Sequence, residues 1–399
     1  MKLLWVKTDF LHPTTRGGQI RTLELLRRLH LRHEIHYIAF HDPDEPEGLK
    51  RASEYSSKAY PIDFQLVDKS SPAFIGELIA GLFSSMPVTV RRCRSADMRL
   101  QIERLIRQER FDRVICDFLS PAPNIPDLGS CVLFQHNVEA VIWKRRAEHA
   151  PDPLRRLYLK LQAKHMIRYE GRVCRSVEKV IAVSETDAAI MREWYGVKRA
   201  ETVPTGVDAE YFKSRSPVAS ATDLVFVGSL DWAPNIDGID WFQREVLPLI
   251  LQRKPDCSIA IVGRKPPHAI QELGARYPGI QVTGTVPDVR PWLWQSKLSI
   301  VPLRVGGGTR LKIFESMAAG VPVISTAIGA EGLGARDGDT IRIADAPQDF
   351  AAACIAMLED AAERERLRDR ALQMVTERYS WEVVASAFEK LLIASAAVS

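Results

Sequence analysis

Several features that would mark a class of protein are missing from this sequence. No stretch reaches the roughly 18 consecutive apolar residues that a membrane-spanning helix needs. The apolar run at the N-terminus, Met1–Lys7, is too short for a signal peptide. Internal repeats and low-complexity segments are absent. The net charge of +4, from 54 basic and 50 acidic residues, is too small to indicate a nucleic-acid-binding protein.

Cysteine pairs are missing too. No two of the six cysteines form a CxxC motif, and they are scattered as Cys93, Cys116, Cys131, Cys174, Cys257 and Cys354. This pattern argues against a disulfide framework and against a cysteine-ligated zinc site. Reduced thiols are typical of the cytoplasm, so we expect a cytoplasmic protein.

The chain does contain enough apolar sequence for more than one domain. It has 399 residues, of which 46% are hydrophobic and 26% are charged, as in ordinary globular proteins. A chain of this length predicts two or three domains, each with its own core.

The most informative stretch runs from Leu298 to Ser325. An apolar run of strand length, Leu298–Leu303, is followed by three glycines, which are Gly306, Gly307 and Gly308. Thr309 is a suitable N-cap for the helical pattern that comes next, and Gly320 ends that pattern. A second short apolar run, Val321–Ser325, completes a predicted unit of strand, glycine loop, helix and strand.

The chemistry of this unit favours an anionic ligand. Glycines let a ligand approach the backbone, and the start of a helix presents unpaired N–H groups. Arg310 and Lys312 stand in the first turn, where the helix dipole disfavours cations, so we expect them to face a bound anion. Glu315 follows at a position where its carboxylate can accept hydrogen bonds from hydroxyl groups. A diphosphate beside a ribose fits this set, whereas an ordinary turn with a solvated basic helix start is the structural alternative.

A second glycine loop lies near the N-terminus. Gly17 and Gly18 follow the first predicted strand, Leu3–Val6, and precede a helical pattern. They can contact phosphate or sugar, although a structural turn is about as common for a lone glycine pair. The spacing of the dinucleotide fingerprint, GxGxxG, is absent here, which argues against an oxidoreductase or an epimerase.

His136 follows the predicted strand Cys131–Gln135 directly. Ligands bind at the carboxyl ends of the strands in open parallel sheets, so His136 is a candidate site residue. The structural alternative is a histidine that is hydrogen-bonded within a loop.

Residues 73–83 form an apolar helical pattern, and four arginines follow, which are Arg91, Arg92, Arg94 and Arg99. Such a helix can lie on an anionic membrane or contact a lipid-linked acceptor. A helix packed against the protein core is the more common case, and we favour it here.

The region from Glu201 to Thr222 divides the chain. Proline, glycine and polar residues interrupt the alternation of strands and helices, which then resumes with a strand at Leu224–Gly228 and another at Ser258–Val262. Both halves alternate strand and helix, so the predicted class is α/β with two doubly wound, Rossmann-like domains. A cleft between two such domains is the default ligand site.

These motifs resemble those of glycosyltransferase family 4, whose members are retaining enzymes of the GT-B fold. The resemblance rests on the segment from Gly306 to Ile324 and on four shorter motifs in the same order as in the family: Val203–Asp208, Phe226–Gly228, Ile261–Gly263 and Gly284–Asp288. It covers nearly the whole chain and is closest to bacterial exopolysaccharide or cell-surface sugar transferases.

The resemblance implies an acceptor-side domain at residues 1–204 and a donor-binding domain at residues 205–379. It also implies that the last helix, in residues 380–399, packs back on the first domain. The donor would be a nucleotide-diphosphate sugar, with uridine slightly ahead of guanosine. The implied donor-binding residues are Gly17, Gly18, Gly228, Gly263, Gly307, Gly308, Thr309 and Glu315, and the implied catalytic residues are Arg310, Lys312 and His136.

Two departures from the family pattern matter. Gly307 stands where the first glutamate of the Glu-x7-Glu motif is expected, so backbone N–H groups would have to replace that carboxylate. Ser229 stands where an arginine is usual, and the usual lysine nearby is also missing, with Asp237 close to its place. Arg310 and Lys312 must then neutralise more of the negative charge of the diphosphate.

We therefore expect a retaining, metal-independent hexosyltransferase that makes a polysaccharide or surface glycan without a cofactor. Its partners would be the donor and a sugar or lipid-linked acceptor, with no nucleic acid. Peripheral contact with the inner face of the membrane is left open, and the sequence predicts no particular oligomeric state. The alternative that the missing glutamate suggests is a non-catalytic nucleotide-sugar binding protein.

Overall fold

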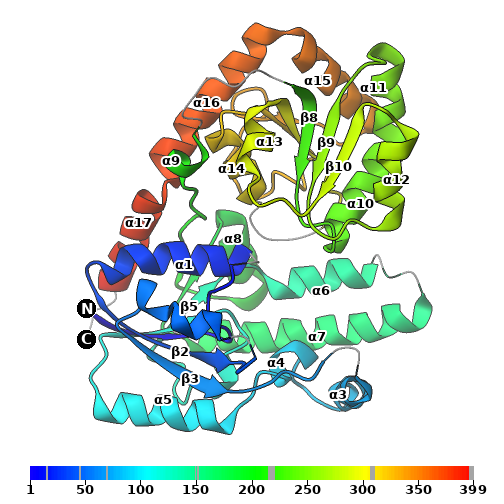
Figure 1. The fold of residues 1–399 in the computed structure, drawn as a ribbon. Coiled ribbons are helices and arrows are strands. Elements are labelled where there is room, and N and C mark those ends of the chain that lie inside the picture. The colour runs from blue at the N-terminus through cyan, green and yellow to red at the C-terminus, as the bar shows by residue number, and fades with distance from the viewer. Residues whose placement is uncertain are drawn as a thin grey trace. The chain divides into compact units, whose positions relative to one another are not determined.

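The computed structural model describes residues 1–14, 17–44, 46–68, 71–148, 150, 152–213, 221–305 and 311–394. It divides into two compact units, one formed by residues 1–205 together with the chain from Val384 onward, and the other by Gly206–Val383. Each unit has a parallel sheet of its own, with helices around it (Figure 1). The predicted class, α/β with two Rossmann-like domains, is confirmed.

A seven-stranded sheet in the order β3-β2-β1-β4-β5-β6-β7 forms the centre of the first unit. Its strands are β1 (Lys2–Val6), β2 (Glu34–His41), β3 (Lys58–Asp63), β4 (Arg113–Asp117), β5 (Cys131–Gln135), β6 (Lys179–Ala182) and β7 (Ala200–Thr202). All neighbours are parallel, and Leu4 of β1 pairs with His36 on one side and with Val114 on the other. Every residue of β5 is buried, which explains its continuous apolar sequence.

Helices connect these strands and cover the sheet, with α1 and α5 on opposite faces (Figure 1). They are α1 (Gly17–His30), α2 (Glu47–Lys50), α3 (Pro72–Leu82), α4 (Val88–Arg91), α5 (Ala96–Gln108), α6 (Glu139–Glu148), α7 (Pro153–Ser176) and α8 (Glu185–Tyr195), with short 3-10 turns at Ala52–Glu54 and Ala122–Asn124. Ser184 caps α8 as expected, because its Oγ accepts a hydrogen bond from the backbone N–H of Asp187 at 3.0 Å.

The preferred interpretation of residues 73–83, a helix packed against the core, is confirmed for one side of the helix only. The helix forms as α3, but Ile75 and Ile79 are 59% and 54% exposed, and Phe83 at its end is 88% exposed. Leu78, on the other side, packs against the core of the first unit. The amphipathic pattern could not show this, because a short helix that is apolar nearly all round has no polar side to mark its exposed face.

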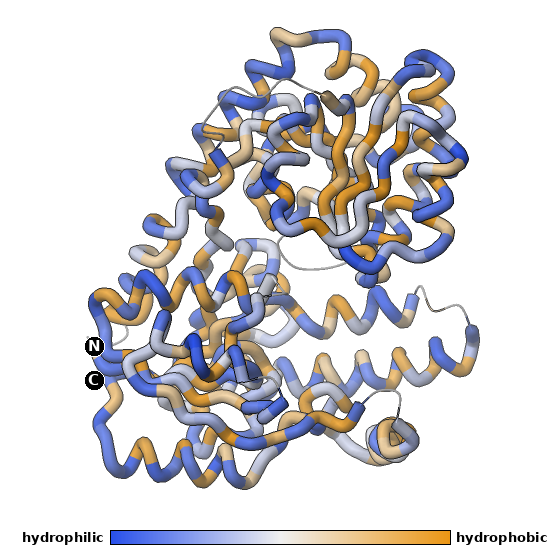
Figure 2. The backbone as a smooth tube through the Cα atoms, in the orientation of Figure 1, coloured by the Kyte–Doolittle hydropathy of each residue, from blue (hydrophilic) through white to orange (hydrophobic). Residues whose placement is uncertain are grey.

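The second unit is built around a six-stranded sheet in the order β10-β9-β8-β11-β12-β13. Its strands are β8 (Thr222–Val227), β9 (Ile259–Val262), β10 (Ile280–Gly284), β11 (Ser296–Val301), β12 (Val323–Ser325) and β13 (Arg342–Ile343). Leu224 and Phe226 of β8 belong to one core, whereas Val225 between them belongs to another on the opposite face. Apolar colour is accordingly concentrated along these strands in Figure 2.

In the second unit, a π-helical turn interrupts the series of α-helices. They are α9 (Ala209–Phe212), α10 (Ala233–Trp241), α11 (Leu247–Arg253), α12 (His268–Arg276), α13 (Arg290–Trp294), α14 (Leu311–Ala318), α15 (Pro347–Glu359) and α16 (Ala361–Tyr379). A π-helical turn, Phe242–Val246, joins α10 to α11. It directly precedes the first turn of α11, which contains Pro248 and so lacks one backbone N–H donor.

The last helix, α17 (Trp381–Ala394), begins in the second unit and packs on the first. Phe388 is fully buried, and its ring centre lies 5.8 Å from that of Trp5 and 5.0 Å from that of Phe134. Lys179 and Arg113 also donate hydrogen bonds to backbone carbonyls near the end of the helix.

All six cysteines are free and buried, in agreement with the expectation of unpaired thiols. Among the residues that the structure describes, no helix combines the length and the apolar character that crossing a bilayer requires.

Candidate functional site

Four of the predicted site residues meet at the carboxyl edge of the second sheet or on the helix beside it. Gly228 follows β8, Gly263 follows β9, and Lys312 and Glu315 lie on α14, which begins after β11. This edge is where open parallel sheets bind ligands. Four further predicted residues, Gly307, Gly308, Thr309 and Arg310, lie outside the described residues, so the proposed capping by Thr309 is not tested.

The two glycines at this edge are required by close packing. A Cβ on Gly228 would collide with the Nζ of Lys312 and lie 2.8 Å from the Nδ2 of Asn235. A Cβ on Gly263 would collide with the carbonyl oxygen of Gly228. Any side chain at either position would therefore displace the cation or the backbone around it.

Two contacts with other described residues help to hold Lys312 in this space. Its Nζ donates a hydrogen bond to the Oδ1 of Asn235 at 2.8 Å and lies 4.4 Å from the ring centre of Phe226. Asn235 is itself fixed, because its Nδ2 donates to the carbonyl oxygen of Ser229 at 2.7 Å. The result is an ammonium group positioned beside bare backbone at the end of β8.

Glu315 lies three residues after Lys312, on the same face of α14. Among the described residues its carboxylate has no hydrogen-bonding side-chain partner, and it is partly exposed. Burial raises the pKa of Glu315 to about 7, against the opposing effect of the Lys312 charge. A partly desolvated carboxylate that lacks a partner is ready to accept hydrogen bonds from hydroxyl groups.

Arg264 is a residue of this edge that the sequence analysis missed. Its Nε donates to the Oγ of Ser229 at 2.6 Å, and its Nη2 lies 3.5 Å from a carboxylate oxygen of Asp231. A guanidinium therefore stands next to Ser229, the position where the family resemblance leads one to expect an arginine. The available signal was the arginine that directly follows the Ile261–Gly263 motif.

Asp237, noted in the sequence for its place near the missing lysine, has a cationic partner of its own. Its carboxylate accepts hydrogen bonds from Arg304, from Nη2 at 2.6 Å and from Nε at 3.1 Å. Arg304 follows β11 and leads toward the glycine triplet, so this pair ties the start of that segment to α10.

Of the remaining predicted residues, His136 belongs to a buried polar cluster in the first unit, around Asp117 at the end of β4. The Oδ1 of Asp117 lies 2.9 Å from the Nζ of Lys7 and 2.8 Å from the Nε2 of His136. Its Oδ2 accepts hydrogen bonds from Trp5 at 2.8 Å and from Thr22 at 2.7 Å. Burial alone would raise the pKa of Asp117, but the charge of Lys7 holds it below its ordinary value.

Both ring nitrogens of His136 face protein groups. Arg21 can only donate, and its Nη1 lies 2.8 Å from the Nδ1 of His136, so the ring proton belongs on Nε2, toward Asp117. Burial lowers the pKa of His136 to about 3, outweighing the attraction of Asp117, and the ring is therefore neutral. It also stacks on Phe118 at 4.0 Å between ring centres.

The first glycine loop lies against this cluster. Gly17 begins α1, and a Cβ on Gly18 would lie 3.0 Å from the ring of Phe118 and 3.7 Å from the Nδ1 of His136. Phe118 has a φ of 75°, a left-handed conformation that is uncommon for a residue with a side chain. The start of α1 can lie this close to the ring of Phe118 because Gly18 has no side chain.

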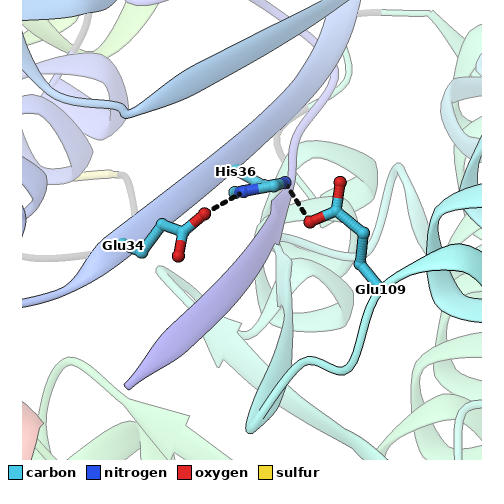
Figure 3. Close-up of side chains that lie close together, drawn as sticks. All are labelled: Glu34, His36 and Glu109. Carbon is cyan, nitrogen blue, oxygen red and sulfur yellow. Dashed lines mark hydrogen bonds and ion pairs between the residues drawn. The ribbon is translucent and has the colours of Figure 1, made fainter.

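A possible metal site lies elsewhere in the first unit. Glu34, His36 and Glu109 have ligand atoms close enough together to hold an ion (Figure 3). However, the Nζ of Lys2 lies 2.5 Å from Glu109 and 3.5 Å from Glu34, and Lys58 lies 3.6 Å from Glu109. The lysines neutralise both carboxylates, so this cluster is an ion-pair network.

Comparison with known proteins agrees with this architecture. Residues 15–211 match the family described as Glycosyltransferase Family 4, and residues 221–360 match the one described as Glycosyl transferases group 1. A protein of Klebsiella pneumoniae, described as an uncharacterized 44.6 kDa protein in the cps region, is 22% identical over 98% of this chain and 99% of its own length.

Solved structures match over the full chain. Sucrose-phosphate synthase from Thermosynechococcus elongatus superposes with a TM-score of 0.74 at 16% identity and covers 100% of both chains. HepE from Anabaena, crystallised with UDP, has a TM-score of 0.67 at 12% identity and covers 99% of this chain and 100% of its own.

The two parallel sheets, with glycines and charged residues at their carboxyl edges, define a glycosyltransferase of the GT-B fold. The matches to its two halves allow a narrower statement. The chain belongs to glycosyltransferase family 4.

Proposed function

We propose that this glycosyltransferase takes its sugar from a nucleoside-diphosphate donor and that its second unit binds the diphosphate and the ribose. The observation that carries the proposal is the arrangement on α14. The ammonium of Lys312 is fixed beside the bare backbone of Gly228, and the carboxylate of Glu315, which has no partner in the described part of the chain, follows one turn later. A cation suits a phosphate, and a carboxylate suits the paired hydroxyls of a ribose.

The proposed chemistry is electrostatic. When the bond between the anomeric carbon and the β-phosphate oxygen breaks, its electron pair stays on the diphosphate as negative charge. Lys312 and Arg264, together with Arg310 from the predicted glycine loop, would stabilise this charge as it develops. In this proposal the protein cations do the work of a metal ion, and the acceptor hydroxyl gives its proton to the departing phosphate on the same face, with retention.

His136 takes the role of a positioning residue in this proposal. Because Arg21 donates to its Nδ1, and its Nε2 is buried 2.8 Å from Asp117, it is not available as a base. It would instead fix Gly18 and the start of α1, so that backbone N–H groups of this loop face the donor.

Uridine is the base that we propose first, because a structural relative is a complex with UDP. A surface polysaccharide is the proposed product class, since a full-length relative lies in a cps region. The six free thiols suit a reducing compartment, and we propose the cytoplasmic side of the membrane.

Calorimetry with UDP and GDP, followed by turnover of the matching sugar nucleotides, tests the proposal. Replacing Lys312 by methionine should lower turnover by roughly 100-fold, since a preorganised charge would be lost from the departing phosphate. Lys213→Met, which removes an exposed lysine, is the control and should leave turnover unchanged. Full turnover of Lys312→Met would remove the lysine from the reaction.

A non-catalytic nucleotide-sugar binding protein is the second candidate, favoured by Gly307 in place of a glutamate. It predicts tight nucleotide binding with no release of UDP from the sugar nucleotide. A phosphorus NMR time course on the purified protein separates the two functions, and the anomeric proton coupling of any product reports retention or inversion.

A further inference from the structure

The outer face of α3 is apolar and exposed. Ile75, Ile79 and Leu82 on the helix and Phe83 at its C-cap are 59%, 54%, 43% and 88% exposed. Their spacing of three or four residues places Ile75, Ile79 and Leu82 on one side of the helix. The other exposed positions of α3 are also uncharged, and they are Pro72, Ala73, Gly76 and Ala80.

The inner side of α3 is anchored to the rest of the unit. Glu77, its only charged residue, lies 2.5 Å from the Nε of Arg92, and its carbonyl oxygen accepts a hydrogen bond from Arg91 at 2.7 Å. The carbonyl oxygen of Gly81 accepts another from Gln162 of α7 at 3.3 Å. The exposure of the apolar face is thus a property of a packed helix.

The beginning of α7 extends this apolar surface. Leu154 and Leu157 are 82% and 68% exposed. Leu154 lies one turn before Tyr158, whose hydroxyl is 3.6 Å from the place of a Cβ on Gly81 at the end of α3. We call this surface the apolar patch, and it consists of Ile75, Ile79, Leu82, Phe83, Leu154 and Leu157.

The exposed side of α7 is basic. Lys160, Lys164, Arg168 and Arg172 are exposed and recur every four residues, so they form one stripe along the helix, called the basic stripe below. The only acidic residue within α7, Glu170, is buried and accepts hydrogen bonds from groups of the first unit that include Gln135 and Tyr195. No exposed acidic side chain within α7 therefore opposes the charge of the basic stripe.

We propose that the apolar patch and the basic stripe dock the first unit on an anionic lipid bilayer. The patch would enter the boundary between headgroups and acyl chains, and the stripe would face the lipid phosphates. An anionic polymer would pair with the stripe but offers no apolar counterpart to the patch. The proposal goes beyond glycosyl transfer, because none of these residues belongs to the candidate site.

Vesicle sedimentation with the full chain tests this surface. The protein should bind vesicles of phosphatidylcholine that contain about one third phosphatidylglycerol, more weakly at high salt, and bind poorly to phosphatidylcholine alone. The triple variant Ile75→Ser, Ile79→Ser, Phe83→Ser should lower the partition coefficient roughly tenfold or more. The triple variant Lys160→Gln, Lys164→Gln, Arg168→Gln should weaken binding and flatten its salt dependence.

Matched controls replace exposed residues of the same kind elsewhere. Leu31→Ser with Leu100→Ser, and Arg253→Gln with Arg276→Gln, should bind vesicles as the wild type does. UDP affinity, measured for every variant, shows whether the fold and the donor site are intact, so failure here is distinct from failure of the proposed function. The proposal would be overturned if the wild-type protein did not bind the anionic vesicles, or if the serine variants bound them equally well. The proposal would also be overturned if light scattering showed a dimer that the serine substitutions dissociate and no vesicle binding were observed.

Discussion

The ammonium of Lys312 occupies space that any side chain at Gly228 would fill. Asn235 holds that ammonium from one side, and its amide also fixes the backbone of Ser229. Near this group the chain has a serine, not an arginine, at position 229. Arg264, which comes after the neighbouring strand β9, supplies a guanidinium there instead. At the scale of single residues, the site is thus defined by which side chains are absent as much as by those present.

The ionisation of Glu315 should couple to both stability and nucleotide binding. Its folded-state pKa of about 7 exceeds the ordinary value of 4.5, so the folded protein binds the proton more tightly and loses stability as pH rises from about 5 to 8. Relative to Glu315→Gln, we expect a loss of up to about 3 kcal/mol across that range, measured by urea unfolding at each pH.

Ribose hydroxyls would favour the ionised form of Glu315. UDP affinity should therefore rise from pH 6 to pH 8 in the wild type, with release of a proton, and should be weaker and lose that part of its pH dependence in Glu315→Gln. Calorimetry in two buffers of different ionisation enthalpy measures both quantities. An unchanged affinity in the variant would take Glu315 out of the nucleotide site.

Arg264 should contribute to the binding of the diphosphate. Replacing it with serine should weaken UDP binding by roughly 10- to 100-fold, the usual range for a lost charged hydrogen bond. Adding Ser229→Arg to this variant should restore much of the affinity, because the new guanidinium would come from the adjacent strand end. Arg276→Ser, which changes an exposed arginine of α12, is the control. Rescue would be absent if Arg264 acted only by supporting the loop that contains Asp231.

At the scale of elements, the carboxyl ends of the parallel strands place the candidate residues. Lys7, Asp117 and His136 come at the ends of β1, β4 and β5, which pair as neighbours. Continuous apolar runs predict β1, β5, β8, β9, β11 and β12. β3, β7 and β13 have no such run, because β3 contains Pro61 at the edge of its sheet and the other two are only three and two residues long.

The final helix should contribute strongly to the stability of the first unit. Phe388→Ala should cost about 3 to 5 kcal/mol, since it empties a space between the rings of Trp5 and Phe134. Urea unfolding followed by tryptophan fluorescence measures the change. Ile393→Ala on the same helix removes a side chain that is 52% exposed and should cost much less. Equal costs for the two variants would contradict the packing of Phe388 against Trp5 and Phe134.

At the scale of the whole molecule, the chain passes between the two units twice, after Thr205 and after Val383. The two passages touch within the second unit. A Cβ on Gly206 would lie 2.5 Å from ring atoms of Trp381, and Val207 donates a hydrogen bond to Tyr379 at 2.7 Å. Within the first unit, Thr205 accepts a hydrogen bond from the Nε of Arg21 at 2.7 Å, which connects it to the polar cluster around Asp117.

Gly206 should therefore tolerate no side chain. Gly206→Val should lower the free energy of unfolding of the second unit by about 1 to 3 kcal/mol, because Trp381 is buried and cannot move away freely. Differential scanning calorimetry, in which the two units can melt separately, measures this. Gly76→Ala, at a glycine with open space around it, should not destabilise the protein. A stable Gly206→Val variant would show that the ring of Trp381 can yield.

The sequence by itself determined the elements and the order in which they occur. Continuous apolar runs predicted β5, helical spacing predicted α14, and glycines after strands predicted which end of the sheet carries the candidate residues. These are local properties, because a pattern of apolar residues and chain breakers acts over ten residues or so. The family resemblance then joined the local motifs into one fold.

Only the tertiary structure decided which charges meet and which surfaces stay exposed. Arg264 and Ser229 are separated by 35 residues, and Arg21 and His136 by 115, so no local pattern could pair them. The apolar face of α3 is exposed because its other side is already packed, which depends on Arg92 and on α7. Partners distant in sequence set the state of His136 and of α3, because burial and pairing are properties of the folded chain.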